Sequence, residues 1–404
     1  MQDQALDAVR SARRLGLMGG TFDPIHNEHI SLARTALEQF SLDAVLFLVA
    51  GDPPHKRISA NEQHRFEMAK LALAGEDRMF ASSIELNRSR TTYTVDTLKL
   101  LKKELPQAEL YYIVGEDTLI ALQKGWKNVQ EVYGLTRFIC FGRLGYDSKE
   151  IDPRMRVEFA KKQPTAVSST SIRNRISQEL PVEGELPKAV FDYIRRHGLY
   201  ARECMTFDEA KDMLHGIISE QRYVHTMLVV QTAELLARQY GENTARARWA
   251  ALLHDCAKGL SYEESLTMAA NFHVALDEVT RNEPDLLHAP LGAVLAKEVF
   301  SIDDEQVLSA IRCHTTGRAN MTLLDKILYI SDAIEPNRDY EGVLELRRLV
   351  FEDLDKAVLE YTNNSIAYIV KTGRLLHRNT VDARNDMVLQ LYKNQNKRRI
   401  EYDG

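Results

Sequence analysis

The apolar pattern of the chain changes character near residue 200, and this change constrains the fold more than any other feature. Before it, short apolar runs typical of strands fall at 15–18, 45–50, 79–86, 110–114 and 138–141. Helical patterns lie between them at 31–40, 62–74 and 95–105, and two more close this half at 170–176 and 187–197. The alternation predicts an α/β fold with a doubly wound parallel sheet.

Beyond residue 200 the apolar residues recur every three or four positions, which predicts an all-α helical bundle. The helical patterns fall at 223–240, 245–254, 290–300, 305–313, 323–334 and 343–370. Gly198 fits a helix stop at the join between the two halves. We therefore predict an N-terminal extension (1–14), an α/β domain (15–202), a helical domain (203–392) and a polar, frayed tail (393–404).

Composition excludes several classes of protein. The net charge is −6 and no basic, aromatic-rich stripe is present, which disfavours nucleic-acid binding. No apolar run approaches the ~18 residues of a membrane-spanning helix, and the first residues lack the apolar core of a secretory signal. The cysteines are scattered, so we expect a reduced, cytoplasmic protein; they are Cys140, Cys204, Cys256 and Cys313.

A glycine- and histidine-containing segment, GGTFDPIHNEH at 19–29, follows the first predicted strand and precedes a helix. Gly19 and Gly20 permit close approach of the backbone to a ligand, and the helix start offers N–H groups to phosphate. His26 and His29 share one helix face and are placed to stabilise charge on nucleotide phosphates. The spacing is not G-x-G-x-x-G, so a dinucleotide-binding dehydrogenase is not supported. The alternative is a glycine turn with surface histidines.

Further motifs in this half follow in a fixed order: PPHK at 53–56, YTVDT at 93–97, GED at 115–117 with Trp126 downstream, and SSTSIR at 168–173. With the first segment, they make residues 15–200 resemble the nicotinate mononucleotide adenylyltransferase family of the nucleotidyltransferase superfamily. The resemblance implies transfer of AMP from ATP to nicotinate mononucleotide, giving deamido-NAD and pyrophosphate. It implies direct attack of the mononucleotide phosphate on the α-phosphorus, without a covalent intermediate.

The resemblance also implies residue roles. The ATP-binding set is Gly19, Gly20, Thr21, His26, His29, Gly115, Asp117, Ser169 and Arg173, in which His26, His29 and Arg173 are catalytic. The nicotinate-nucleotide set is Lys56, Thr94 and Trp126. Magnesium would arrive with ATP.

Each role has a structural alternative. Trp126 would then be a packing residue, Asp117 and Thr94 helix caps, and Lys56 a solvated loop charge. Arg173 would pair with a surface acid.

Two features depart from the family pattern. Glu28 stands where the family has glycine, and a carboxylate beside a triphosphate is unfavourable unless it points to solvent. The extension of about 14 residues before the first strand has no role that the sequence reveals. A related adenylyltransferase that acts on nicotinamide mononucleotide or pantetheine phosphate remains the alternative for this half.

In the second half, His254 and Asp255 end an apolar helix. Adjacent residues do not share a helical face, but both side chains can converge on one ion where the helix ends. Imidazole and carboxylate ligands suit zinc, iron or manganese. The other candidate ligands are His225, His288, His314 and Asp332. The alternatives are a cap for Asp255, an ordinary helix histidine for His225 and a loop position for His288.

The order H…HD…H…H…D resembles the HD-domain metal-dependent phosphohydrolases. The flanking segments LLHDCAK, HAP, HTTG and DAIEPNR make residues 206–390 similar to the YqeK branch of that family. The resemblance implies symmetrical hydrolysis of diadenosine tetraphosphate to two ADP by a metal-bound hydroxide.

The resemblance assigns His225, His254, Asp255 and Asp332 as ligands of a metal ion. This ion is iron, or else manganese or zinc. The phosphate chain or a second metal is assigned to Lys258, His288, His314 and Arg338. Another nucleotide substrate, or a non-catalytic nucleotide-sensing module, remains the alternative for this half.

Overall fold

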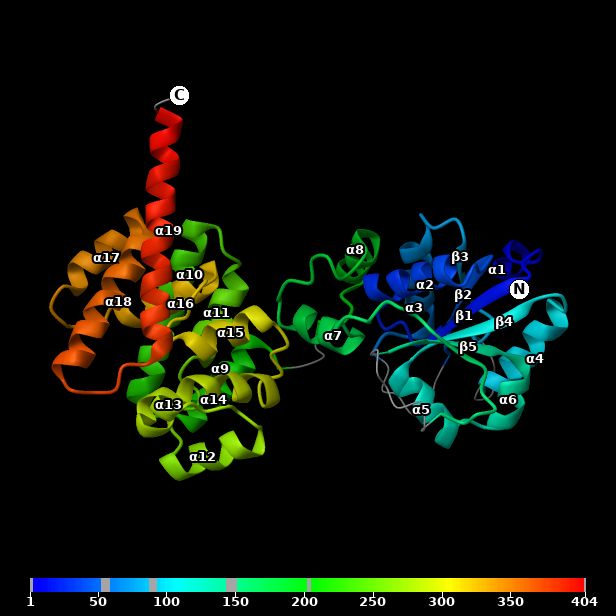
Figure 1. The fold of residues 1–404 in the computed structure, drawn as a ribbon, viewed down its shortest axis with the longest axis horizontal. Helices are drawn as coiled ribbons and strands as arrows, with labels where there is room; N and C mark the ends of the chain where they lie inside the picture. The colour runs from blue at the N-terminus through cyan, green and yellow to red at the C-terminus, as the bar shows by residue number, and fades with distance from the viewer. Residues whose placement is uncertain (1–2, 52–58, 87–92, 143–150, 202–204, 403–404) are drawn as a thin grey trace. The chain divides into compact units, whose positions relative to one another are not determined.

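The computed structural model describes residues 3–51, 59–86, 93–142, 151–201 and 205–402 (Figure 1). The chain divides into two compact units. Unit 1 comprises Met1–Ile176 and Val182–Glu203, and unit 2 comprises Ser177–Pro181 and Cys204–Gly404. In the parts of the chain that the structure describes, no helix is both long and apolar enough to cross a membrane.

Unit 1 is built on a six-stranded parallel sheet with the strand order β3-β2-β1-β4-β5-β6, which confirms the predicted α/β class. The strands are β1 (Arg14–Gly20), β2 (Ala44–Val49), β3 (Met79–Ser82), β4 (Glu109–Gly115), β5 (Arg137–Phe141) and β6 (Val157–Phe159). The prediction of a strand to residue 86 was too long. Strand β6 was not predicted, because its three residues are partly exposed and form no apolar run.

Helices cover both faces of this sheet. In β2, Val45, Phe47 and Val49 face one apolar cluster, whereas Leu46 and Leu48 face the other. Both faces are therefore buried, which explains why the strands read as continuous apolar runs. The helices of unit 1 are α1 (Gln4–Ala8), α2 (Asn27–Gln39), α3 (Glu62–Leu73), α4 (Thr94–Glu104), α5 (Glu116–Gly125), α6 (Val129–Leu135), α7 (Ser169–Ser177) and α8 (Lys188–His197).

The N-terminal extension is part of this core. One carboxylate oxygen of Asp3 accepts the N–H of Ala5 at 3.0 Å and caps α1, and the other accepts the Ser82 hydroxyl at 2.6 Å. Ala5 and Val9 pack in the same cluster as the buried face of α4. Helix α1 thus lies against β3, the outermost strand of the sheet (Figure 1).

The regular elements in the described residues of unit 2 are helices, as predicted, and the buried Trp249 belongs to its core. Its helices are α9 (Phe207–Ile217), α10 (Glu220–Tyr240), α11 (Thr244–Leu253), α12 (Tyr262–Asn271), α13 (Glu278–Asn282), α14 (Pro284–Glu298), α15 (Glu305–Cys313), α16 (Leu323–Ile334), α17 (Val343–Glu352), α18 (Leu354–Lys371) and α19 (Arg378–Tyr402).

Two expected boundaries in unit 2 were wrong. Helix α14 begins at Pro284 rather than at residue 290, so Pro290 lies inside it. The expected helix over 343–370 is broken at Asp353, whose carboxylate accepts the N–H of Lys356 at 3.1 Å and starts a new helix. Helix α19 runs to Tyr402 and so includes most of the tail at 393–404, whose fraying stays a prediction.

Candidate active sites

The glycines of the first motif lie where two strands end side by side. Strands β1 and β4 are parallel neighbours, so Gly20 and Gly115 reach the same edge of the sheet. A Cβ atom at Gly19 would lie 2.2 Å from the Tyr112 hydroxyl, and one at Gly115 would lie 2.8 Å from an Asp117 carboxylate oxygen. The buried Tyr112 side chain therefore favours glycine at position 19, whereas the Asp117 carboxylate is the end of a flexible side chain and can turn away from position 115.

His26 and His29 meet at the first turn of α2. The backbone N–H of His26 donates to Nδ1 of His29 at 3.2 Å, and the two rings stack with centroids 3.7 Å apart. Because its Nδ1 accepts, a neutral His29 carries its proton on Nε2. His26 is 4% exposed, and burial lowers its pKa to about 4. His26 is thus a neutral group at pH 7.

A buried arginine holds the backbone around this motif. Arg65 of α3 is 1% exposed. Its guanidinium donates to the carbonyls of Thr21 at 2.8 Å, Ala50 at 2.6 Å, Gly51 at 2.5 Å and Ala60 at 3.1 Å. No motif marks this residue, because one arginine within a helix is indistinguishable in the sequence from a surface charge.

Asp23 also holds this loop in place, a role that its position in the motif does not reveal. Its buried carboxylate accepts the N–H groups of Ser59 at 2.8 Å and Ala60 at 3.1 Å. It also accepts the Tyr200 hydroxyl at 2.7 Å, and burial together with this carboxylate raises the pKa of Tyr200. The contacts fix the loop that carries the motif to the end of unit 1.

Helix α7 brings two further predicted residues to the same loop. The Arg173 guanidinium donates to the carbonyl of Asp23 at 2.7 Å and approaches the Thr170 hydroxyl at 3.4 Å. The Ser169 hydroxyl donates to the carbonyl of Pro24 at 2.9 Å. The loop at 19–29 and the SSTSIR segment are therefore neighbours in space.

The predicted residues near β4 are not helix caps. The N-cap of α5 is Gly115 and that of α4 is Tyr93, so Asp117 and Thr94 both lie within the first turn of a helix. Trp126 is partly buried in an apolar cluster and packs edge-to-face on Tyr112 with centroids 5.6 Å apart. Lys56 lies outside the described residues.

Glu28 does not point into solvent. Its side chain is 11% exposed, and Oε1 accepts the N–H of Thr165 at 3.1 Å. The Lys162 ammonium lies 3.9 Å from the same oxygen. The charge of Glu28 is therefore compensated within the protein, which removes the objection raised by its sequence position.

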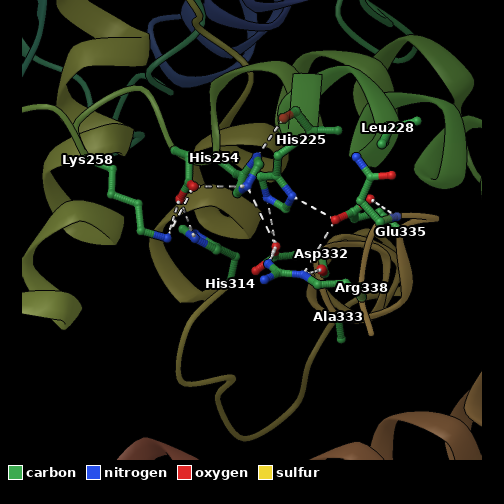
Figure 2. A network of polar contacts seen from close by, with 12 residues as sticks. His225, Leu228, His254, Lys258, His314, Asp332, Ala333, Glu335 and Arg338 are labelled. Atoms are coloured by element: carbon green, nitrogen blue, oxygen red, sulfur yellow. Dashed lines mark hydrogen bonds and ion pairs between the residues drawn. The ribbon is translucent and has the colours of Figure 1, made fainter. Parts of the chain in front are cut away.

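The histidines and aspartates predicted in the second half converge in unit 2. Figure 2 shows His225, His254, His314 and Asp332 turned toward one another. Ligand atoms of His225, His254 and Asp332 lie within 4.8 Å of one another, as do those of His254, Asp255 and His314. The two groups share His254.

His288 joins the same cluster from α14. Its Nε2 lies 3.1 Å from Nε2 of His314 and 3.2 Å from Oδ1 of Asp255. His288 is buried and lies within α14, so the alternative of a loop position for this residue is wrong. All six predicted imidazole and carboxylate groups thus belong to one cluster.

The backbone orients two of the imidazoles. Nδ1 of His254 donates to the carbonyl of Ala251, and Nδ1 of His314 to that of Ile311, both at 2.7 Å. Each ring therefore presents the lone pair of Nε2 to the cluster. Nε2 of His254 is buried and has no hydrogen-bond partner among the described residues. An orphaned acceptor between carboxylates fits a bound cation.

The charge states of His254 and Asp255 suit metal binding as well. Burial lowers the pKa of His254 to about 4, so this ring is neutral. Burial alone would raise the pKa of Asp255, but the hydrogen bond from His288 holds that pKa below its usual range. Neutral imidazoles and ionised carboxylates are the forms that bind metals.

Two cations flank the cluster. The Lys258 ammonium lies 3.2 Å from Oδ2 of Asp255, and the Arg338 guanidinium lies 2.5 Å from Oδ1 of Asp332 (Figure 2). The structure also adds a carboxylate that the sequence analysis did not single out. Oε1 of Glu335 lies 3.1 Å from Nδ1 of His225.

Comparison with known proteins finds a matching family model in each unit. The model of the Cytidylyltransferase-like family matches residues 17–175, and that of the HD domain matches residues 222–337. A protein of Tropheryma whipplei named "Probable nicotinate-nucleotide adenylyltransferase" is 38% identical over 183 residues, which cover 45% of this chain and 97% of that relative. The chain belongs to the nicotinate-nucleotide adenylyltransferase family. Within this family member, the second unit contains an HD domain.

Two further proteins are similar to this chain. A Mycoplasma genitalium protein named "Probable nicotinate-nucleotide adenylyltransferase/Ap4A hydrolase" is 28% identical over 349 residues, 84% of this chain and 93% of that relative. A solved structure from Clostridium acetobutylicum, described as a predicted HD superfamily hydrolase involved in NAD metabolism, is 44% identical. It covers 46% of this chain and 99% of its own, with a TM-score of 0.45.

Proposed function

We propose that this adenylyltransferase family member is a bifunctional enzyme. Unit 1 transfers AMP from ATP to nicotinate mononucleotide, and unit 2 hydrolyses diadenosine tetraphosphate (Ap4A) to two ADP. The observation that carries the proposal is that one chain holds a glycine–histidine loop in unit 1 and a buried His/Asp cluster in unit 2. The Mycoplasma genitalium relative, whose name joins the same two activities, is matched over 93% of its length.

In unit 1 the motif residues bind the phosphates of ATP. Gly19, Gly20 and Thr21 let the backbone approach ATP, and His26 and His29 donate to its phosphates beside the start of α2. Arg173 offers a planar pair of donors to the β- and γ-phosphates. Phosphoryl chemistry of this kind needs positioning and charge stabilisation rather than a protein nucleophile.

The remaining predicted residues of unit 1 select the substrates. Gly115, Asp117 and Ser169 are assigned to the nucleotide of ATP. Thr94, Trp126 and Lys56 are assigned to nicotinate mononucleotide, with Trp126 stacking on the pyridine ring. Magnesium enters bound to ATP and keeps few ligands from the protein.

In unit 2, His225, His254, Asp255 and Asp332 would hold a divalent metal, for which iron, manganese and zinc all suit the donors. Such a metal supplies a hydroxide at neutral pH by lowering the pKa of its water. Lys258 and Arg338 bind the phosphate chain. His288 and His314 either bind the same chain or hold a second ion.

The hydrolase assignment is tested by incubating the purified chain with Ap4A and Fe²⁺, Mn²⁺ or Zn²⁺ and separating the products by chromatography. We expect two ADP from the wild type and none from Asp255→Ala, which should retain adenylyl transfer. AMP and ATP as products would mean attack at another phosphorus. No cleavage with any metal would favour a nucleotide-sensing module.

The transferase assignment is tested by comparing nicotinate mononucleotide with nicotinamide mononucleotide as substrates in the presence of MgATP. We expect a higher kcat/KM for the nicotinate form, and Arg173→Ala should reduce it without affecting Ap4A hydrolysis. A preference for the amide would contradict the assignment.

A further inference from the structure

Glu335 touches the metal cluster of unit 2 without belonging to its predicted ligands. It is the C-cap residue of α16, and its side chain is 3% exposed. Oε1 lies 3.1 Å from Nδ1 of His225, while Nε2 of the same ring lies 3.1 Å from Oδ1 of Asp332. The imidazole of His225 therefore lies between Asp332, a predicted metal ligand, and the carboxylate of Glu335 (Figure 2).

The Glu335 carboxylate is itself held in place. Its second oxygen, Oε2, accepts the backbone N–H of Asn337 at 2.7 Å. The Arg347 guanidinium of α17 donates to the backbone carbonyls of Glu335 at 2.7 Å, Ile334 at 2.9 Å and Arg338 at 2.9 Å. The turn that follows α16 is thus fixed from a neighbouring helix, and the carboxylate has little freedom to leave His225.

We propose that Glu335 is a positioning residue for metal binding, an inference that rests on the proposed metal site. It accepts the Nδ1 proton of His225 and so keeps the lone pair of Nε2 directed at the ion beside Asp332. His254 and His314 use neutral backbone carbonyls for this purpose. A buried carboxylate is a stronger, charged acceptor and makes His225 a more basic ligand.

The test is Glu335→Gln in the full chain. If the glutamine oxygen faces His225, its NH2 group faces the Asn337 N–H; if the amide is reversed, NH2 faces Nδ1 of His225. Either orientation loses one hydrogen bond and the charge. We expect Mn²⁺ affinity, measured from the electron paramagnetic resonance signal of the free aqueous ion, to fall about 10- to 100-fold. The metal-free protein should stay folded, with an unfolding temperature lowered by the loss of one buried hydrogen bond.

Three further variants make the result decisive. Glu345→Gln removes an exposed carboxylate from α17 and should bind Mn²⁺ as the wild type does. His225→Ala should lose this ligand altogether and sets the lower limit. Glu335→Asp keeps the charge but withdraws it by one methylene, so its affinity should lie between those of the wild type and E335Q. If E335Q does not fold, E335D decides the question in its place.

The outcomes separate this inference from the proposed function. Wild-type affinity in E335Q, beside tight binding by the wild type, would overturn the role of Glu335 alone. Failure of the wild type to bind Mn²⁺ would overturn the metal site and the role of Glu335 together. Loss of Mn²⁺ affinity in E335Q supports the role even if Ap4A proves not to be the substrate.

Discussion

His26 lies buried at the start of α2, and the cost of charging it there links the stability of unit 1 to pH. Its pKa is about 4 in the folded protein and about 6.5 when exposed. Between these values the unfolded state binds more protons, so stability is complete above pH 6.5 and falls as the pH falls toward 4. The loss between pH 7 and pH 5 is about 2 kcal/mol.

This dependence is measured by urea unfolding at pH 7 and pH 5. Trp249→Phe leaves Trp126 as the single tryptophan, which reports on unit 1. In this Trp249→Phe background, the free energy of unfolding should fall between pH 7 and pH 5 by about 2 kcal/mol less in the His26→Asn variant than in the protein that retains His26. An equal loss in both proteins would show that His26 is not the group responsible.

The Arg65 guanidinium donates hydrogen bonds to backbone carbonyls in the loops after β1 and β2. Arg65→Met leaves these buried acceptors unpaired, and we expect a loss of about 3 kcal/mol or more in urea unfolding. Arg34→Met is the matched control. Arg34 pairs with Glu76 at the surface, so its loss should cost less than about 1 kcal/mol. Similar losses in the two variants would contradict the organising role of Arg65.

The sites were predictable to the extent that their residues stand in sequence motifs. The cluster of His225, His254, Asp255 and Asp332 follows from the order of histidines and aspartates. Residues that act across elements carry no such signal. Arg65 binds backbone carbonyls, and Glu335 reaches a histidine 110 residues away in the chain. Only the folded backbone shows what such side chains contact.

The adjacency of β1 and β4 explains why the first motif begins with glycine. A methyl group at position 19 would overlap the Tyr112 hydroxyl, which a Cβ would approach to 2.2 Å. We expect Gly19→Ala to cost about 1–3 kcal/mol and to reduce adenylyl transfer, because β4 must move away. Tyr112→Phe removes the overlapping oxygen and should restore part of both losses in the double variant.

A double-mutant cycle measures this coupling through urea unfolding and kcat/KM. Additive effects of the two substitutions would mean that the hydroxyl is not the obstacle. Gly134→Ala is the control, since a Cβ at Gly134 meets no atom within 4 Å. It should leave both quantities close to those of the wild type.

Elements were predictable where burial imposes a regular period, and their ends were less so. Strands buried on both faces read as apolar runs, whereas the short β6 does not. Pro290 suggested a helix start, but Pro284 occupies the first turn, where a missing N–H costs nothing. The break at Asp353 is a single residue within an apolar period, which the pattern alone cannot separate from a continuous helix.

The two units, which bind different ligands, should respond separately to metal removal. A metal present at 100 times its dissociation constant stabilises the folded state that binds it by about 2.7 kcal/mol. We expect chelation with EDTA to lower the unfolding temperature of unit 2 and to leave that of unit 1 unchanged. Scanning calorimetry with and without added Mn²⁺ measures both transitions.

The matched variant for this experiment is Asp255→Ala, which should lose the metal-dependent shift without any chelator. A shift of the unit 1 transition on chelation would contradict the separation of the two sites. MgATP should act on unit 1 in the opposite sense and raise its unfolding temperature.

The position of α1 against β3 has a consequence for the behaviour of the chain in concentrated solution. An outermost strand presents unpaired backbone groups that can recruit a strand from another molecule. Without α1, the apolar contacts of Ala5 and Val9 and the link from Asp3 to Ser82 would be absent, leaving β3 more accessible. Residues without a chemical role in the motifs would then protect this strand, and their removal should lower the solubility of the protein.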